Sequence, residues 1–244
     1  MPRYKLSIAY EGTRYYGWQK QPDAQTVEGT IEAGLKQILG ETVDVVGQGR
    51  TDRGVHAEGQ TAHMDVSELL NLKKVKYGLL GVLPRDIAVW NIEPVDEGFH
   101  ARFHAQGRQY RYQIITRPLP LYRHMTHRVL KPFDYNLMYE CARQVAEIKD
   151  FTNFAHVEPH QPNAHCHIEL SSLEKQGNLI TYRIRADRFL RWMVRRIVGS
   201  MLQVGLGKRK PQYFRDLMFS DDMDESGHAA PAHGLILEEV FYKK

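Results

Sequence analysis

Two consecutive series of strand and helix patterns run through almost the whole chain, and they constrain its fold more than any other feature. In the first series, residues 4–10 alternate apolar and polar side chains as a half-buried strand does. Apolar side chains then recur at helical spacing over residues 26–39, with Thr26 as the predicted N-cap and Gly40 as the predicted stop. Strands are predicted at 43–46, 60–66 and 87–92, and a second helix at 69–80.

The second series repeats this order. Strands are predicted at residues 109–116, 165–174, 179–186 and 235–241, and helices at 135–148 and from Arg188 onward. The expected fold is therefore α+β, with two similar strand–helix–strand–strand units that form antiparallel sheets with helices on one side. We place the division between residues 1–97 and 98–244, because Pro94 and Gly98 mark the junction.

The composition excludes several classes of protein. Of the 244 residues, 42% are hydrophobic, which is enough for a core and argues against a disordered or fibrous chain. The longest apolar stretches are interrupted by Arg or Gly before they reach the length of a bilayer span, and the first residues read as a strand rather than a signal peptide. Only Cys141 and Cys166 occur, so we expect a reducing, cytoplasmic environment.

Positive charge is concentrated in two segments, although the net charge is only +4. Residues 100–131 carry seven basic side chains and no acid, and residues 182–215 carry ten against Asp187 alone. This distribution predicts a basic face and a polyanionic partner, or, on a simpler interpretation, two solvated surfaces without a ligand. Tyr110, Tyr112 and Trp192 lie among the arginines and favour nucleic acid, but charge does not distinguish DNA from RNA.

A glycine-rich loop at residues 47–59 is the most informative motif. It has four glycines and lies between two predicted strands, and its spacing matches neither the phosphate-binding P-loop nor the dinucleotide fingerprint. Asp52 lies there between Arg50 and Arg53. The aspartate has two interpretations: a loop residue that caps backbone amides or pairs with arginine, or an ionised nucleophile or base.

Residues 49–56, Gly-Arg-Thr-Asp-Arg-Gly-Val-His, resemble the catalytic signature of tRNA pseudouridine synthases of the TruA family. Five further blocks resemble the family in the same order, and they cover nearly the whole chain: residues 15–19, 83–89, 99–103 with 108–112, 189–199, and 230–235. Six collinear motifs are a far more specific signal than the aspartate loop alone.

The resemblance implies a role for five residues. Asp52 matches the nucleophile that isomerises uridine by breaking its N-glycosidic bond and rejoining the ribose to C5, and Arg195 matches the arginine that pairs with this aspartate. Tyr110 matches the tyrosine that lies against the uracil and is a candidate for proton transfer. Arg50 matches the arginine that enters the stem where the target base leaves, and Leu235 the apolar residue beside the nucleophile.

The resemblance also implies the substrate and the assembly. The expected target is uridine in the anticodon stem-loop of tRNA, at positions 38, 39 and 40, held in a central RNA-binding cleft. The family works as a homodimer, with RNA crossing both subunits, and no metal or organic cofactor is expected. A uridine in a stem must be extruded before it reacts, and a flat guanidinium suits the vacated space.

The predicted helix from Arg188 places a row of arginines on one face. Arg188, Arg191 and Arg195 are separated by three and four residues, which is the spacing of neighbours on a helix. We therefore expect Arg188 and Arg191 to contact phosphates near the pocket. An adjoining apolar face would pack on the sheet, with Gly199 allowing close approach; it comprises Phe189, Met193, Ile197 and Val204.

Two other groups of residues resemble metal sites only superficially. Four histidines lie near Cys166, but strand alternation directs Cys166 away from its neighbours and no spacing matches a zinc site; they are His156, His160, His165 and His167. A solvated loop is the simpler interpretation of the acidic run Asp221, Asp222, Asp224 and Glu225. We expect His56 and His63 to have structural or supporting roles.

The chain departs from the common family pattern at two places. Arg53 stands where many members have alanine, and no arginine occurs between Arg143 and Arg183, a region where many members carry one. One alternative is therefore a paralogue that modifies a different RNA uridine. Two others are a catalytically silent RNA-binding protein, against which the set Asp52, Tyr110 and Arg195 argues, and a hydrolase that uses Asp52 as a base, which lacks a paired carboxylate.

Overall fold

The computed structural model describes residues 1–156, 163–219 and 227–243, which form two compact units. The first unit contains Met1–Gln106 and Ile236–Lys244, and the second contains Gly107–Leu235. This division lies nine residues beyond the one predicted at 97/98, and the end of the chain returns to the first unit. The sequence-based boundary missed this return because a closing strand carries no signal of which sheet it joins.

The first unit contains a sheet of four strands with a short fifth. The order is β4 (Ile87–Val95), β1 (Arg3–Tyr10), β3 (His56–Asp65) and β9 (Leu235–Tyr242), and β2 (Val45–Gly47) pairs with β3. Strand β1 is antiparallel to both neighbours, but β9 is parallel to β3 through His56 and Ala57. The expectation of purely antiparallel sheets was therefore wrong: β9 reaches β3 through the whole second unit, and such a long connection permits parallel pairing.

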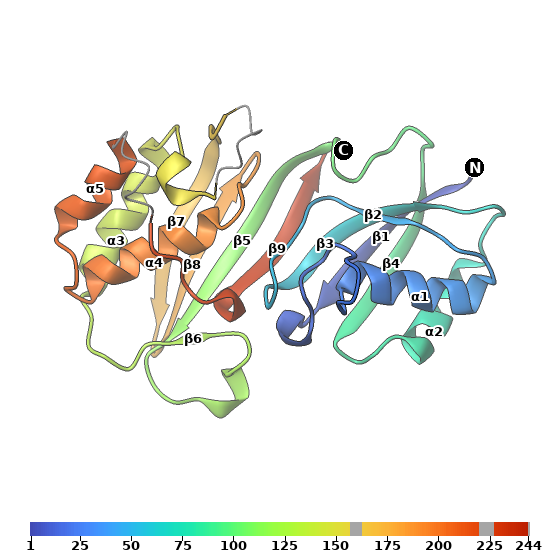
Figure 1. Cartoon of the computed structure of the whole chain (residues 1–244), viewed down its shortest axis with the longest axis horizontal. Helices are drawn as coiled ribbons and strands as arrows, with labels where there is room; N and C mark the ends of the chain where they lie inside the picture. The colour runs from blue at the N-terminus through green and yellow to red at the C-terminus, as the bar shows by residue number, and fades with distance from the viewer. Residues whose placement is uncertain (157–162, 220–226, 244) are drawn as a thin grey trace. The chain divides into compact units, whose positions relative to one another are not determined.

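Two helices pack on this sheet. Helix α1 (Val27–Leu39) begins at the predicted N-cap, where the Thr26 hydroxyl accepts the Gly29 N–H, and ends at Gly40 in the left-handed conformation, φ 76°. Helix α2 (Leu72–Val82) has Asn71 as its N-cap and contacts both α1 and β4 (Figure 1). Buried Ile31, Leu35, Val75 and Leu79 form the apolar faces that the periodicity predicted.

The second unit is built on an antiparallel sheet. Strand β5 (Ala105–Ile115), most of which belongs to this unit, pairs with β8 (Leu179–Ala186), and β8 pairs with β7 (Ile168–Gln176). A two-residue strand, β6 (His127–Arg128), runs parallel to the end of β5 and was not predicted. Strand β8 has the predicted bounds, whereas β7 begins three residues later than predicted.

Three helices accompany this sheet: α3 (Tyr135–Gln144), α4 (Met193–Gly205) and α5 (Pro211–Phe219). The predicted helix from Arg188 was wrong at its start, because α4 begins at Met193 and Trp192 is in the left-handed conformation, φ 65°. The Asp187 carboxylate accepts the N–H groups of both Arg188 and His167, which holds the chain in a turn instead. Helix α5 was not predicted.

The remaining regular elements are five short 3-10 turns: Gly12–Arg14, Pro120–Tyr122, Val145–Glu147, Thr152–Phe154 and Ala232–Gly234. The turn at Val145–Glu147 continues α3 in tighter form, which explains why the apolar pattern suggested a helix as far as residue 148. None of the described helices combines the length and apolar character that crossing a membrane requires.

Candidate active site

The loop that carries Asp52 is held from behind by residues 15–19. The Trp18 N–H donates to the Thr51 carbonyl at 3.1 Å, and the Thr51 hydroxyl lies 2.8 Å from that of Tyr10. Gly17 has φ +90°, and a Cβ placed on it would lie 2.5 Å from the Thr51 carbonyl oxygen. Only glycine combines this conformation with so close an approach, so two motifs far apart in the sequence form one structural unit.

A second set of contacts fixes the far side of the loop. The Val55 N–H donates to the Asp52 carbonyl at 3.1 Å, which closes a tight turn through Gly54 at φ +77°. The Gly12 N–H donates to His56 Nδ1 at 2.9 Å, and a Cβ on Gly12 would lie 2.0 Å from the Val55 carbonyl oxygen. Asp52 is half-buried and is the first residue of this turn. The predicted structural role of His56 is confirmed, because its ring accepts a backbone N–H.

A buried carboxylate organises the segment behind the loop. Glu28, in the first turn of α1, accepts the indole N–H of Trp18 at 3.2 Å, the side-chain amide of Gln19 at 2.7 Å and the Lys20 backbone N–H at 2.7 Å. Burial raises the pKa of Glu28 because it removes water from the charged form, although these donors oppose the shift. Three donors on one carboxylate make residues 18–20 a rigid support.

The two arginines beside Asp52 both contact the segment of residues 15–19. Arg50 is exposed, and its Nε donates to Gln19 Oε1 at 3.2 Å. The guanidinium carbon of Arg53 lies 4.2 Å from the centre of the Tyr16 ring, which is the geometry of a cation–π contact. Arg53, the departure from the common family pattern, thus stacks on a neighbouring motif.

The block at residues 83–89 joins the same assembly through Asp86. Its carboxylate accepts the Tyr15 hydroxyl at 2.6 Å, and its carbonyl accepts the Glu11 N–H at 2.9 Å. Burial and the neighbouring Asp86 carboxylate raise the pKa of Tyr15, so the phenol stays protonated and donates. Three of the six sequence blocks therefore meet around the aspartate loop.

Tyr110 lies in the second unit, on β5, and is buried with 8% of its surface exposed. It pairs with Ile184 across the sheet, and its ring meets that of Phe189 edge-on, with centroids 5.2 Å apart. An edge-to-face contact fixes the plane of a ring while leaving its flat faces to other neighbours. The structure places Tyr110 as a packed strand residue, and its role toward uracil stays a prediction.

Arg195 is anchored to the segment that precedes β9. Its Nε donates to the Ala230 carbonyl at 2.8 Å, and its own carbonyl accepts the Ala230 N–H at 2.8 Å. The predicted close approach at Gly199 is present, since a Cβ there would lie 1.8 Å from the His228 carbonyl oxygen. Leu235 is buried at the end of this segment, at the start of β9. The last two sequence blocks thus pack together.

Arg188 and Arg191 do not share a helix face with Arg195, which corrects the sequence-based expectation. Both precede α4, in the turn fixed by Asp187. Arg191 is exposed, with its guanidinium carbon 5.3 Å from the centre of the Trp192 ring. Their proposed phosphate contacts therefore rest on position beside the helix N-terminus and on charge, rather than on a stripe.

The predicted site residues divide between the two units. The first unit holds Asp52 and Arg50; the second holds Tyr110, Arg188, Arg191, Arg195 and Leu235. Sequence reasoning missed Gln19 and Glu28 as individual residues. A signal was present, because Trp18 and Gln19 belong to a matched block, but the carboxylate that fixes them lies nine residues further along, inside a helix.

No group of three or more metal-ligating side chains occurs within residues 1–156, 163–219 and 227–243. His160 and the acidic run Asp221, Asp222, Asp224 and Glu225 lie outside the described residues. Cys166 is buried while His165 and His167 are exposed, in the alternation that the sequence predicted. His63 has the structural role expected of it, because its Nδ1 accepts the Ala101 N–H at 3.2 Å.

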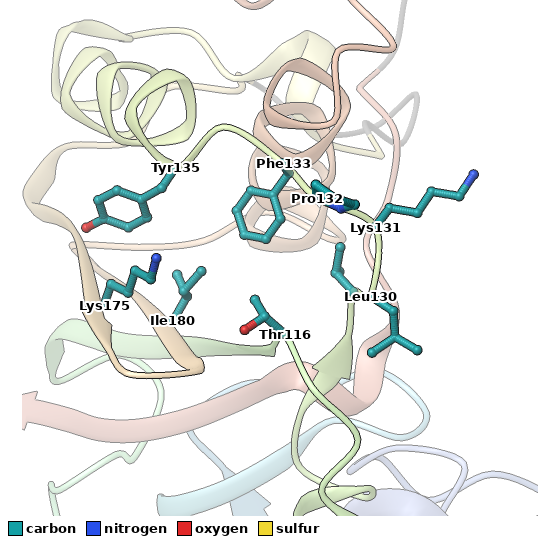
Figure 2. Close-up of a pocket in the computed structure, with 9 residues that line it drawn as sticks. Thr116, Leu130, Lys131, Pro132, Phe133, Tyr135, Lys175 and Ile180 are labelled. Atoms are coloured by element: carbon teal, nitrogen blue, oxygen red, sulfur yellow. The ribbon is translucent and has the colours of Figure 1, made fainter.

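Two pockets formed by described residues lie away from Asp52, Tyr110 and Arg195, none of which lines either of them. One, of about 230 Å³, lies in the second unit between Phe133, Ile180 and Thr116, and Lys131 points away from it (Figure 2). The other, of about 440 Å³, lies in the first unit beside Phe103.

The chain is similar in sequence to known proteins along almost its whole length. The family model of tRNA pseudouridine synthases matches residues 6–104 and 148–243. A tRNA pseudouridine synthase A of Bacteroides thetaiotaomicron is 40% identical over 99% of this chain and 91% of that protein, and one of Myxococcus xanthus is 38% identical over 100% and 93%. A solved Cbf5-Nop10-Gar1 complex covers 98% of this chain and 60% of that chain, at 10% identity and a TM-score of only 0.34.

The chain belongs to the family of tRNA pseudouridine synthases. It is an isomerase that converts uridine to pseudouridine in tRNA, and the relatives named above match it along almost their whole length. The family resemblance read from six motifs is thereby confirmed.

Proposed function

We propose that Asp52 is the nucleophile of this isomerase and that the target is uridine 38, 39 or 40, in the anticodon stem-loop of tRNA. The observation that carries the proposal is the construction of the Asp52 turn. Gly12, Gly17 and the Trp18 N–H all approach the backbone of residues 51–55 closely. Such close packing around one half-buried carboxylate is typical of a group whose position matters to the reaction.

The reaction exchanges one bond to the ribose for another. The C1′–N1 bond breaks, the C1′–C5 bond forms, the proton on C5 leaves and N1 gains a proton. Asp52 supplies the attacking carboxylate, whose bond to the substrate breaks again before the product leaves, and Tyr110 is proposed to lie against the uracil and to take part in the proton transfer. Tyrosine offers both a stacking face and a hydroxyl for these two tasks.

Arginines supply the remaining roles in the proposal. Arg50 is exposed beside Asp52 and would occupy the space that the extruded base leaves. Arg195 is proposed as the cation that pairs with the reactive carboxylate, and its double contact with Ala230 supports a fixed position. Arg188 and Arg191 are proposed phosphate contacts, and Leu235 the apolar neighbour of the nucleophile.

The proposed assembly is a homodimer in the cytoplasm, with tRNA in a central cleft and no cofactor. Both cysteines, Cys141 and Cys166, are free thiols in the structure, which suits a reducing compartment. A paralogue that modifies another uridine remains the alternative, because Arg53 and the missing arginine between Arg143 and Arg183 depart from the common pattern.

Asp52→Asn tests the nucleophile. The change is nearly isosteric, so we expect isomerisation to be abolished while tRNA affinity stays within a few-fold, because the basic segments are untouched. Single-turnover tritium release from C5-labelled tRNA measures the reaction, and fluorescence anisotropy measures binding. Substantial turnover by the purified variant would refute the assignment. Carbodiimide mapping of tRNA from cells with and without the gene identifies the modified positions. It therefore decides whether the enzyme modifies uridines 38, 39 and 40 or, as a paralogue would, a different uridine.

A further inference from the structure

The turn at residues 99–104 presents an open aromatic ring beside a pocket. Phe103 is 74% exposed, and one side of its ring is covered by the ring of His100, with centroids 4.3 Å apart and planes inclined by 35°. The guanidinium carbon of Arg102 lies 5.9 Å from the centre of the same ring. A single exposed apolar side chain is ordinary on a protein surface, so this ring is of interest because it borders a pocket.

Backbone contacts hold this ring in place. His100 Nδ1 accepts the N–H groups of Arg102 at 3.1 Å and Phe103 at 3.4 Å, and the His100 N–H donates to His104 Nδ1 at 3.2 Å. The Tyr242 hydroxyl donates to the Ala101 carbonyl at 2.7 Å, which ties the turn to β9. The turn that carries the ring is therefore ordered, and a ligand that stacks on the ring loses little free energy in ordering the backbone.

The chemistry of the pocket matches one unpaired nucleotide. Its volume of about 440 Å³ is lined by aromatic side chains together with Gln106 and Lys243, and none of the described residues that line it is Asp or Glu. Rings stack on a base, an amide can bond the polar edge of the base, and an ammonium attracts a phosphate. The lysine favours an anionic ligand and the rings favour one that carries a flat base, so the two together favour RNA over a protein partner.

We propose that this pocket binds a single unpaired nucleotide of the tRNA substrate, at a position other than the target uridine, with its base stacked on Phe103 and its phosphate near Lys243. Nothing in the proposed chemistry at Asp52 requires this subsite. Only a base that is unpaired and unstacked within the tRNA can stack on the ring. The subsite would therefore make binding depend on the tertiary structure of the tRNA.

The test compares tRNA affinity among variants that keep or remove the ring. Phe103→Leu should weaken binding at least five-fold, since stacking on one base accounts for about 5-fold to 100-fold in affinity. Phe103→Tyr should restore binding, and Lys243→Ala should lower the salt slope of binding by about one unit. Trp90→Leu is the matched control, because Trp90 is 51% exposed on β4 and lies outside the pocket lining.

Fluorescence anisotropy with Asp52→Asn as the common background keeps this test independent of the reaction. Unchanged affinity in Phe103→Leu would overturn the proposal. Analytical ultracentrifugation without RNA covers the remaining possibility: if Phe103→Leu changes the oligomeric state, the ring belongs to a subunit interface and the nucleotide subsite is refuted.

A separate observation concerns Gln19, which lies between Arg50 and Glu28. Its amide nitrogen donates to Glu28 Oε2 at 2.7 Å, and its oxygen accepts Arg50 Nε at 3.2 Å. A carboxylate accepts only, so Glu28 fixes which end of the amide faces outward, and that end is the acceptor that an arginine requires. The geometry points to Gln19 as a positioning residue for Arg50, an inference that rests on the proposed role of Arg50 in base extrusion.

A double-mutant cycle tests this inference. Gln19→Met should slow single-turnover isomerisation at least ten-fold on a paired target, less on a tRNA whose target uridine is mismatched, and not at all in the Arg50→Ala background. Gln21→Met is the control, because the Gln21 amide donates to the Tyr16 and Gln19 carbonyls and not to Arg50. Additive losses in the double variant would overturn the positioning role alone. Normal turnover by Arg50→Ala would remove the proposed role of Arg50 and the positioning role together.

Discussion

Replacing Gly17 with alanine places a methyl group against the backbone that carries Asp52. The added Cβ would lie 2.5 Å from the Thr51 carbonyl oxygen and 3.3 Å from the Asp52 carbonyl carbon, whereas ordinary contacts begin at 3.4 Å. The Thr51 oxygen must therefore retreat by about 0.9 Å. A displacement of about 1 Å at a reacting group can cost about 100-fold in rate, so we expect kcat to fall by about that factor.

Gly40→Ala separates this displacement from the cost of the backbone conformation. Gly40 ends α1 with φ +76°, close to the +90° of Gly17, but a Cβ there meets nothing within 4 Å. Both variants should lose about 1–2 kcal/mol of unfolding free energy, because alanine is strained at positive φ. Only Gly17→Ala should also lose activity and the further stability that the clash removes.

Single-turnover tritium release from C5-labelled tRNA measures the rates, and urea unfolding measures the stabilities. Gly40→Ala should react within about two-fold of the parent enzyme. A Gly17→Ala enzyme with a rate within about five-fold of the parent would refute the reasoning, since it would show that the position of the Asp52 backbone tolerates such a shift.

Three further outcomes are expected. Tyr110→Phe should bind tRNA normally and react slowly, because stacking survives and the hydroxyl is lost; a near-normal single-turnover rate would reduce Tyr110 to a platform. Arg188→Ala and Arg191→Ala should each lower the slope of log affinity against log salt by about one unit, as anisotropy titrations would show. Burial lowers the pKa of His63 to about 4, so the unfolded chain gains a proton first as the pH falls from 6.5, and the fold should lose up to about 3 kcal/mol by pH 4. His63→Gln should flatten that part of the urea-unfolding profile, and an unchanged profile would contradict the assignment.

Local signals in the sequence were sufficient where the structure itself is local. The bounds of α1 follow from a threonine hydroxyl that caps one end and a glycine that adopts positive φ at the other. Strand β8 was bounded correctly because glycine and asparagine precede it and alternation continues through it. In both cases, the determining residues lie within the element or directly beside it.

Elsewhere, prediction from local sequence patterns failed because contacts outside the pattern determine the structure. The arginine spacing before α4 imitates a helix, but Asp187 binds two backbone N–H groups and Trp192 turns the chain at positive φ. The support of the aspartate loop depends on Glu28, whose burial inside a helix face could not be read from its own neighbours. The sequence was sufficient to identify the blocks that carry the candidate site, whereas the contacts between these blocks could be seen only in the structure.

The return of β9 to the first unit has a consequence for how the chain is made. The ribosome must synthesise every residue of the second unit before the strand that completes the sheet of the first. Until then β2 pairs with β3 only at residues 62–64, and His56 and Ala57 lack their partner strand, which leaves an unpaired stretch of the kind that recruits strands from other chains. The first unit is therefore completed only after the second has been synthesised, so a ribosome that stalls between residues 106 and 236 leaves a partly folded chain with this end of β3 unpaired.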